Sequence, residues 1–327
     1  MKPNKEILFY YESRQNPNGD PGFENQPRLM SDDTIMVTDV RIKRTIRDYA
    51  RDYLGQVLFV DDGKDGKPVT SEKKASELLE TKILPIDTMR KLLLKTFDTP
   101  LFGALVPLRK KSKKDNDNGE KDDRVSSSFK LTGPVQFAIG RSVNKVKVIN
   151  PLISGRFVGK EKGNDAQESS TFGKFYSVEY ALIKITGIVA PANLGKYGDD
   201  KEVIKAFNLA EELLALALWN GTNSLISRSK YPQRSVLYLE VTYKSPKVYN
   251  DLSVLVNEKE DMKGWATALS RDTFDFSKLL AAAEKRKGDV DKIRIIHCDD
   301  VDNSLHDLVA KLKSMGVEVE DVSCQTK

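Results

Sequence analysis

The segment TDVRIKRTIRDYARDYL, residues 38–54, places apolar side chains at helical spacing and five cations among them. On a helical wheel of about 100° per residue, the apolar side chains form one stripe. That stripe consists of Ile42, Ile46, Tyr49 and Tyr53. It predicts a helix that packs on a sheet, with Thr38 or Asp39 as the N-cap.

The opposite side of this predicted helix carries positive charge. It is formed by Arg44, Arg47 and Arg51, with Lys43 one turn before Arg47. Arg41 falls nearer the acidic side, with Asp48 and Asp52. The helix dipole disfavours cations in the first half of a helix unless an anion lies there too. A phosphate at the helix start would remove this conflict, because backbone N–H groups and Lys43 would both point at it. The alternative is a solvated face with local ion pairs.

The loop before this helix, residues 13–30, is rich in Gly, Pro and Asn. Its polar side chains include Arg14, Asn16, Asn18, Asn25 and Arg28. Such a density of short polar donors favours contact with a sugar–phosphate chain. A turn-rich surface loop without a ligand is the alternative.

The composition limits the classes of function. The chain has 327 residues with 53 basic and 48 acidic side chains, and a net charge of +5 is too small to indicate nucleic acid by itself. Cys298 and Cys324 are too few for a disulfide framework or a zinc site, so a reducing cytoplasm is expected. His297 and His306 are the only histidines, which nearly excludes a histidine metal centre. No apolar run resembles a signal peptide or a membrane span.

The rest of the chain alternates between strands, helices and long polar connections. Strands are predicted at 6–15, 133–140, 144–150, 175–190, 235–243, 292–298 and 317–322. Helices are predicted at 75–84, 87–97, 199–219 and 303–315. Asp199 or Asp200 should cap the helix at 199–219, and residues 109–124 form a low-complexity loop.

Without the excursions at 55–125 and 146–175, the order of elements is strand, helix, strands, helix, strand. This order is that of the ferredoxin-like β-α-β-β-α-β core, the scaffold of RNA-recognition-motif domains. We therefore expect an α+β fold in one elaborated domain. Fold alone does not decide function, since ferredoxin-like domains also serve enzymes, metal carriers and regulatory modules.

Several segments resemble a known family when taken together and in order. They are SRQNPNGDP and TDVRIKRTIRDY near the N-terminus, FDTPLFGAL at 97–105, LTGPVQFAIGRSVNKV at 131–146, TFGKFYSVEYALIKITGIVAPANL at 171–194 and WNGTNSLISRSKYPQRSVLYLEVTY at 219–243. The chain resembles the backbone subunit of CRISPR Cascade complexes, family seven of the Cas proteins, and is most similar to type I-B and I-C members. The tail from about residue 250 resembles the family less clearly.

The resemblance implies a fold and a function. The expected fold is a ferredoxin-like RNA-recognition-motif palm at 1–54 and 129–327, with helical fingers at 55–128 and a β-hairpin thumb at about 146–175. Phe157 or Leu152 would be the wedge of the thumb. Copies would stack head to tail along one CRISPR RNA and grip its backbone, while its bases pair with target DNA in antiviral defence.

The resemblance also implies binding residues and partners. The expected RNA contacts are Arg14, Asn16, Asn18, Lys43, Arg44, Arg47, Arg141, Ser142, Lys145, Lys196, Asn223, Arg228 and Lys230. The expected partners are CRISPR RNA, target DNA, copies of the chain in a helical filament, and the cap, large and processing subunits. No catalytic residue, metal or cofactor is expected, and no membrane.

Other interpretations stay open at this point. Type III relatives cut RNA with an aspartate in an early loop, where Asp20, Asp32 and Asp33 lie here, so a RAMP-type endoribonuclease is the alternative function. A structural assembly protein would bind its own copies without RNA. Three aromatic residues of the first strand, Phe9, Tyr10 and Tyr11, could stack on bases or pack in the core. His297 is expected to be a core or edge residue and Cys298 a small buried one.

Overall fold

The computed structural model describes residues 3–107, 128–150, 152–155, 171–270, 273–301 and 303–323. The predicted low-complexity loop at 109–124 lies outside the described residues. So do Cys324, Phe157 and the side chain of Leu152, so the expectations for the thumb wedge stay untested.

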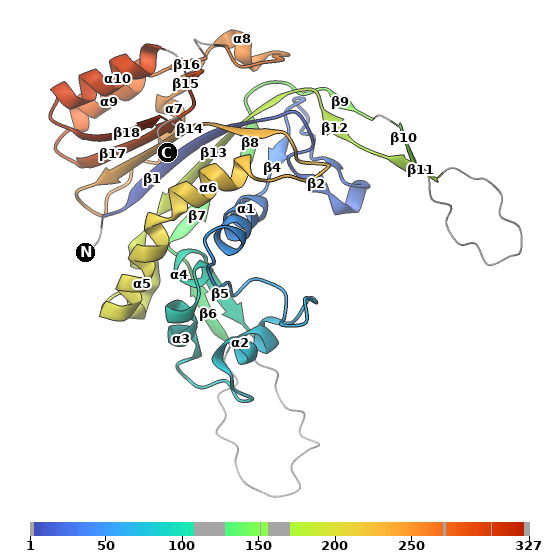
Figure 1. Ribbon diagram of the computed structural model, residues 1–327. Coiled ribbons are helices and arrows are strands. Elements are labelled where there is room, and N and C mark those ends of the chain that lie inside the picture. Colours follow the sequence, from blue (N-terminus) through green and yellow to red (C-terminus); the bar gives the residue numbers. More distant parts are fainter. Residues whose placement is uncertain are drawn as a thin grey trace, which may run out of the picture.

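One central sheet runs through the molecule (Figure 1). In order across the sheet, its strands are β18 (Glu318–Ser323), β17 (Val290–His297), β14 (Gln233–Tyr243), β1 (Lys5–Ser13), β13 (Ala181–Val189), β8 (Gly140–Ser142) and β4 (Met36–Val37). The short strand β7 (Val135–Phe137) also pairs with β13. All neighbours on this path are antiparallel except β17 and β18, which are parallel.

Along the chain, two helical segments lie between strands of the sheet. Helix α1 (Asp39–Asp52) follows β1, and helices α5 (Lys201–Glu212) and α6 (Leu214–Asn223) connect β13 to β14. The predicted mixture of helices and strands around a sheet is therefore confirmed. Asp200 caps α5 as predicted, by accepting from the backbone of Glu202 and Val203, but the single helix predicted for 199–219 is divided at Leu213.

Helix α1 begins where the sequence predicts. The hydroxyl of Thr38 accepts from the backbone N–H of Arg41 at 3.3 Å and so caps the helix. Ile42 and Ile46 are buried in the core, as expected from their stripe. Tyr53 is 61% exposed and was wrongly predicted to pack on the sheet, because it lies at the C-cap, where the helical stripe no longer continues.

Both faces of the sheet are buried. Phe9 and Tyr11 of β1 belong to the core under α1, α5 and α6, whereas Leu8 and Tyr10 belong to a second core on the opposite face. The second core is covered by α7 (Leu252–Leu255), α9 (Ser277–Arg286) and α10 (Asn303–Ser314). The three aromatic residues of β1 thus pack in the core and are not available to stack on bases.

The segment between α1 and β7 forms a small helical unit with its own core (Figure 1). Its elements are α2 (Ser71–Leu79), α3 (Thr88–Lys95), α4 (Asp98–Phe102) and the antiparallel pair β5 (Gly103–Val106) and β6 (Phe129–Thr132). Gly103 has φ +75, and a Cβ there would come within 2.1 Å of the carbonyl oxygen of Leu131. Only glycine therefore permits this close turn between α4 and β5.

A two-part ladder extends from the sheet and points away from the body of the molecule (Figure 1). It consists of β9 (Val148–Ile149) paired with β12 (Ser177–Val178), and β10 (Leu152–Gly155) paired with β11 (Thr171–Lys174). A short hairpin of β2 (Gly19–Asp20) and β3 (Gln26–Pro27), with one 3₁₀ turn (Pro21–Phe23) between its strands, lies in the loop before α1.

The tail continues the sheet. Short elements β15 (Asn257–Glu258), α8 (Glu260–Lys263) and β16 (Phe274–Asp275) precede α9. His297 and Cys298 are buried at the end of β17, as expected, and His297 Nε2 lies 3.3 Å from a carboxylate oxygen of Asp321 on β18. None of the described helices is both long and apolar enough to cross a lipid bilayer.

Candidate nucleic-acid interface

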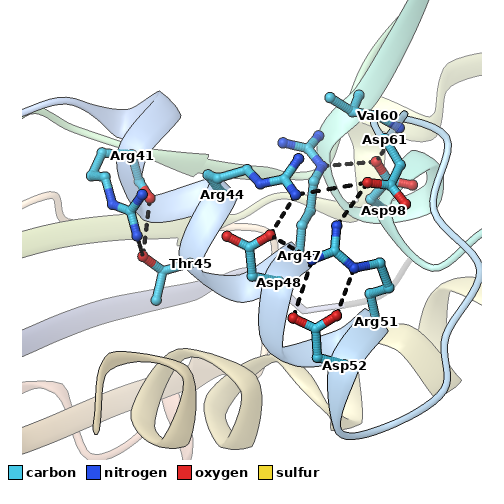
Figure 2. A network of polar contacts seen from close by, with 10 residues as sticks. All are labelled: Arg41, Arg44, Thr45, Arg47, Asp48, Arg51, Asp52, Val60, Asp61 and Asp98. Atoms are coloured by element: carbon cyan, nitrogen blue, oxygen red, sulfur yellow. Dashed lines mark hydrogen bonds and ion pairs between the residues drawn. The ribbon is translucent and has the colours of Figure 1, made fainter. Parts of the chain in front are cut away.

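The second half of α1 is held by a buried ion pair. Arg47 Nε lies 2.8 Å from Asp98 Oδ2, and both side chains are buried (Figure 2). The same carboxylate accepts from the backbone N–H of Phe59 at 2.7 Å and of Val60 at 3.1 Å. Arg47 was predicted to lie opposite the packed stripe and to contact phosphate, but its side chain is buried. Its guanidinium joins α1 to α4 and to the loop after α1, and Phe102 packs against it.

Two more arginines of α1 face acids (Figure 2). Arg44 Nη2 lies 2.5 Å from Asp48 Oδ1, and Arg51 lies 2.8 Å from Asp61 and 2.7 Å from Asp52. The predicted excess of positive charge on this stripe is therefore neutralised by acids from the helix itself and from the loop that follows it. The alternative interpretation, local ion pairs, therefore describes Arg44 and Arg51.

Arg41 lies apart from this network. Its guanidinium Nη2 donates to the hydroxyl of Thr45 at 3.1 Å (Figure 2), and no carboxylate of the described residues lies within ion-pair distance of it. The prediction that Arg41 lies nearer the acidic side agrees with the attraction between its charge and that of Asp48, although Asp48 and Asp52 form their ion pairs with Arg44 and Arg51. Burial is the larger effect and lowers the pKa of Arg41 below its usual value. This cation is thus partly desolvated and forms no ion pair with a carboxylate of the described residues.

Lys230 is the second cation of this kind. Its Nζ donates to the backbone carbonyl of Asn16 at 2.6 Å, and it has no carboxylate partner in the described part of the chain. Burial, with a smaller contribution from the charge of Arg41, lowers the pKa of Lys230 to about 8. The charges of Arg41 and Lys230 therefore repel each other, and neither forms an ion pair with an acid of the described residues.

The loop of residues 13–30 connects these two cations. Asn18 Oδ1 accepts from both the backbone N–H and the hydroxyl of Thr38, each at 3.0 Å. Asn16 Nδ2 donates to the carbonyl of Asn25 at 2.6 Å. Asn16 and Asn18 are only 2% and 6% exposed. The expectation that these amides offer exposed donors is wrong, since they are used to fix the loop against the head of α1.

Three further predicted residues lie around the same loop. Arg14 is exposed and its guanidinium lies 5.1 Å from the ring centre of Tyr180, while that of Arg228 lies 5.4 Å from the ring centre of Phe175. Asn223 is exposed and accepts from the backbone N–H of Ser235 at 2.7 Å. The backbone N–H of Arg14 donates to the carbonyl of Pro232, which joins the loop to the start of β14.

Two further predicted contacts are Lys43 on α1 and Lys196 on the 3₁₀ segment Pro191–Tyr197. Lys43 Nζ lies 3.2 Å from Asp39 Oδ2 and donates to Gln136 Oε1 at 3.4 Å. Gln136 in turn donates to the carbonyl of Gly133, which also accepts from the 3₁₀ segment Pro191–Tyr197 that carries Lys196. Lys196 is exposed on that segment, which is thus linked to Lys43 through Gln136 and Gly133.

A further predicted group lies at the sheet edge formed by β8 and β4. Arg141 pairs with Asp32 at 2.7 Å and Lys145 with Asp33 at 3.3 Å. Ser142 is buried, and its hydroxyl accepts from the backbone N–H of Ile35. The cations of this group are thus balanced by acids. The described part of the chain does not bring all predicted RNA contacts into one cluster.

The three early-loop aspartates of the alternative function all have structural contacts. Asp20 caps the 3₁₀ turn that follows it and lies 3.1 Å from Arg28 Nη1. The hydroxyl of Thr34 holds the pKa of Asp32 below its usual value. Among the described residues, no group of three or more His, Cys, Asp or Glu side chains could hold a metal ion.

Two residues of this region were missed by the sequence analysis. Arg41 was assigned to the acidic side, and Gln233 was not considered. Gln233 Nε2 is buried and donates to no acceptor in the described residues, and Gln233 lines one small cavity together with Arg41 and Thr222. The sequence signal available for Arg41 was its place in the first turn of a cationic helix.

Comparisons with known proteins place the chain in a family and show structures of similar fold. A family model described as CRISPR-associated protein Cas7 matches residues 3–268. A solved structure titled "CRISPR RNA-guided surveillance complex, pre-nicking" is similar at 13% identity and a TM-score of 0.53, covering 97% of this chain and 96% of that chain. A second, titled "CRISPR RNA-guided surveillance complex", has 12% identity and a TM-score of 0.46, covering 90% and 88%. No curated protein matches the chain.

At these identities the structural likeness concerns the fold alone. The family match extends from β1 to the segment that follows α8, and it includes every residue of the candidate interface. On the strength of that match, the chain belongs to the Cas7 family of CRISPR-associated proteins.

Proposed function

We propose that this chain is a backbone subunit of a CRISPR RNA-guided surveillance complex. Copies bind the phosphate backbone of one CRISPR RNA and present its spacer for pairing with target DNA. Membership of the Cas7 family supports this function, as do the titles of the similar structures. A subunit that reads backbone and shape needs cations at defined places and no base-specific pocket.

One observation carries the proposal. Arg41 and Lys230 are partly buried next to each other, and neither has a carboxylate partner among the described residues. Two desolvated cations without a counter-ion raise the free energy of the folded protein. A phosphate between them would remove this cost and would also meet the first turn of α1, where the helix dipole favours an anion.

The predicted residues then divide by role. We assign direct RNA contacts to Arg14, Arg41, Lys43, Lys196, Asn223, Arg228 and Lys230. Asn16, Asn18, Ser142 and Arg47 hold the loops and the helix in position. Arg44, Arg141 and Lys145 contribute less, because an acid already neutralises each of them.

The architecture of the family gives the parts of the chain their functions. We propose that 1–54 and 129–327 form an RNA-recognition-motif palm, that 55–128 form the fingers, and that 146–175 form a thumb whose wedge is Phe157 or Leu152. The order β14-β1-β13-β8, with every neighbouring pair antiparallel, supports the palm. The ladder of β9 with β12 and β10 with β11 supports the thumb.

The proposed setting is a cytoplasmic filament. It contains further copies of this chain, the cap, large and processing subunits, and target DNA, in a complex of type I-B or I-C. The subunit contributes binding and not catalysis. Purified protein with a divalent metal should leave guide and complementary RNA intact, and cleavage abolished by Asp32→Ala or Asp33→Ala would contradict this part.

The function is tested by purifying the chain and measuring its affinity for RNA. We expect one discrete short RNA with a uniform flank to copurify from the host. In gel-shift titrations, the affinity for RNA should be similar across sequences. Removal of both unpaired cations, in Arg41→Ala with Lys230→Ala, should lower it by at least about 100-fold, since hydrogen bonds to charged groups contribute about 1.5–3 kcal/mol each. Assembly without RNA would overturn the proposal.

A further inference from the structure

We infer that RNA binding at the Arg41–Lys230 site takes up a proton on Lys230. This inference rests on the proposed function, and it adds that the affinity for phosphate is coupled to pH. The coupling would arise because the free protein keeps this amine in a place where its charged form is disfavoured.

The surroundings of Lys230 explain why its charge is disfavoured. The side chain is mostly buried, and its Nζ has one close acceptor in the described residues, the neutral carbonyl of Asn16. The charged group that faces it is Arg41 of α1, which has the same sign. Arg41 also interacts with Tyr11 of β1, but burial raises the pKa of this phenol above its usual value, so it stays neutral. On α1, the charge of Asp48 attracts Arg41 and that of Arg44 repels it, and neither acts on Lys230.

Arg41 cannot relieve the repulsion by losing its proton. A guanidinium remains charged in proteins, whereas a lysine amine titrates readily when it is buried. Lys230 is therefore the member of the pair that releases a proton, and its pKa of about 8 places this event just above neutral pH. A phosphate bound between the two cations would favour the charged amine and raise the pKa of Lys230 again.

The consequence for binding follows from linkage. The charged amine binds phosphate, so the affinity is highest below the pKa of free Lys230 and decreases as the pH rises above it. For a single group with a pKa of about 8, the affinity should decrease about tenfold between pH 7 and pH 9. At pH 8, binding should take up roughly half a proton per subunit.

Isothermal titration calorimetry of the full chain tests this directly. An RNA of adenines and cytosines is titrated at pH 8 and constant salt into protein in two buffers of different ionisation enthalpy. These two bases do not ionise between pH 7 and 9, so any difference in heat reports protons taken up by the protein. We expect the uptake in the natural protein, and expect Lys230→Arg to bind RNA with the uptake lost.

The controls separate this inference from the function on which it rests. Lys91→Arg is the matched control, since Lys91 of α3 pairs with Asp87, is not an assigned RNA contact and should leave the uptake on Lys230 in place. RNA binding with no proton uptake would overturn the inference and leave the function standing. Uptake that persists in Lys230→Arg would assign the proton to another group and would also overturn the inference. No RNA binding by any variant would overturn the proposed function itself.

Discussion

The arginines near the start and near the end of α1 are used in opposite ways (Figure 2). In the second half, Arg47 is buried on Asp98, and Arg51 lies against Asp52 and Asp61. Near the start, Arg41 donates to the hydroxyl of Thr45 and forms no ion pair with a carboxylate of the described residues. Arg47 and Arg51 join α1 to the segment that follows it through their carboxylate partners, whereas we propose that Arg41 is available to a ligand.

The difference teaches that counting cations on a helix does not locate a binding site. A buried ion pair is costly to break from one side, because the remaining charge stays buried without compensation. An exposed pair contributes little in either direction. The informative cation is one that is desolvated and forms no ion pair. Lys230 is of this kind, and it lies more than 200 positions away from Asn16, the loop residue that it contacts.

The largest expected effect concerns the buried pair. Asp98→Ala removes the partner of Arg47 and also the acceptor of two backbone N–H groups, those of Phe59 and Val60. We expect the free energy of unfolding to decrease by about 3–5 kcal/mol, measured by urea denaturation followed by circular dichroism. Asp52→Ala, whose side chain is half exposed, is the control and should cost at most about 1 kcal/mol. Equal losses in the two variants would remove the distinction between buried and exposed pairs.

The sequence was sufficient for the parts of the fold that depend on local pattern. The Thr38 cap, the Ile42 and Ile46 stripe and the Asp200 cap follow from hydrogen bonding and periodicity within a few residues. The aromatic and branched residues of β1 correctly predicted a strand, but its three aromatic side chains could not be assigned to a core or a surface from the sequence. Both faces of that strand are buried only because the tail covers the second face.

The candidate site was less predictable, because its charges are compensated by residues distant in sequence. A helical wheel shows only neighbours on the helix, so it cannot show that Asp98, 51 residues away, buries Arg47. In the same way, Arg141 and Lys145 are neutralised by acids of a much earlier loop. The family resemblance supplied candidate positions, and the structure separates the paired cations from the unpaired ones.

A smaller effect on stability, with the opposite sign, is expected at Lys230, one of the two unpaired cations. The pKa of a free lysine is about 10.4, and the folded protein lowers that of Lys230 to about 8. The charged amine therefore destabilises the free protein fully below pH 8, and this cost disappears as the pH rises toward 10. We expect Lys230→Met to raise the free energy of unfolding at pH 7 by on the order of 1 kcal/mol, because part of the gain is offset by the lost hydrogen bond.

Urea denaturation of free Lys230→Met at pH 7 and pH 9.5 checks this expectation. The gain should be present at pH 7 and smaller at pH 9.5, whereas Lys43→Met serves as a control with no such trend. A variant that is less stable than the natural protein at pH 7 would show that Lys230 supports the fold and is not reserved for a ligand.

The smallest effect is expected for the exposed network of the second half. Arg51→Ala should lower the free energy of unfolding by at most about 1 kcal/mol. Salt screens exposed charges, so this difference should vanish near 1 M salt, where the Debye length is only about 3 Å. The cost of Arg47→Ala should persist there, since its pair is buried. Denaturation at low and high salt compares the two variants, and a salt-independent loss in Arg51→Ala would place it with the buried pair.

The salt dependence of RNA binding tests most directly whether the unpaired cations hold the phosphates. Two double variants are compared with the natural protein, Arg41→Ala with Lys230→Ala and Arg44→Ala with Arg51→Ala, after circular dichroism has shown that both are folded. Each lost phosphate contact should reduce the slope of log affinity against log salt by about 1. We predict that the first double variant lowers the slope by about 2 and that the second leaves it unchanged. A slope that falls in the second variant and is kept in the first would contradict the account.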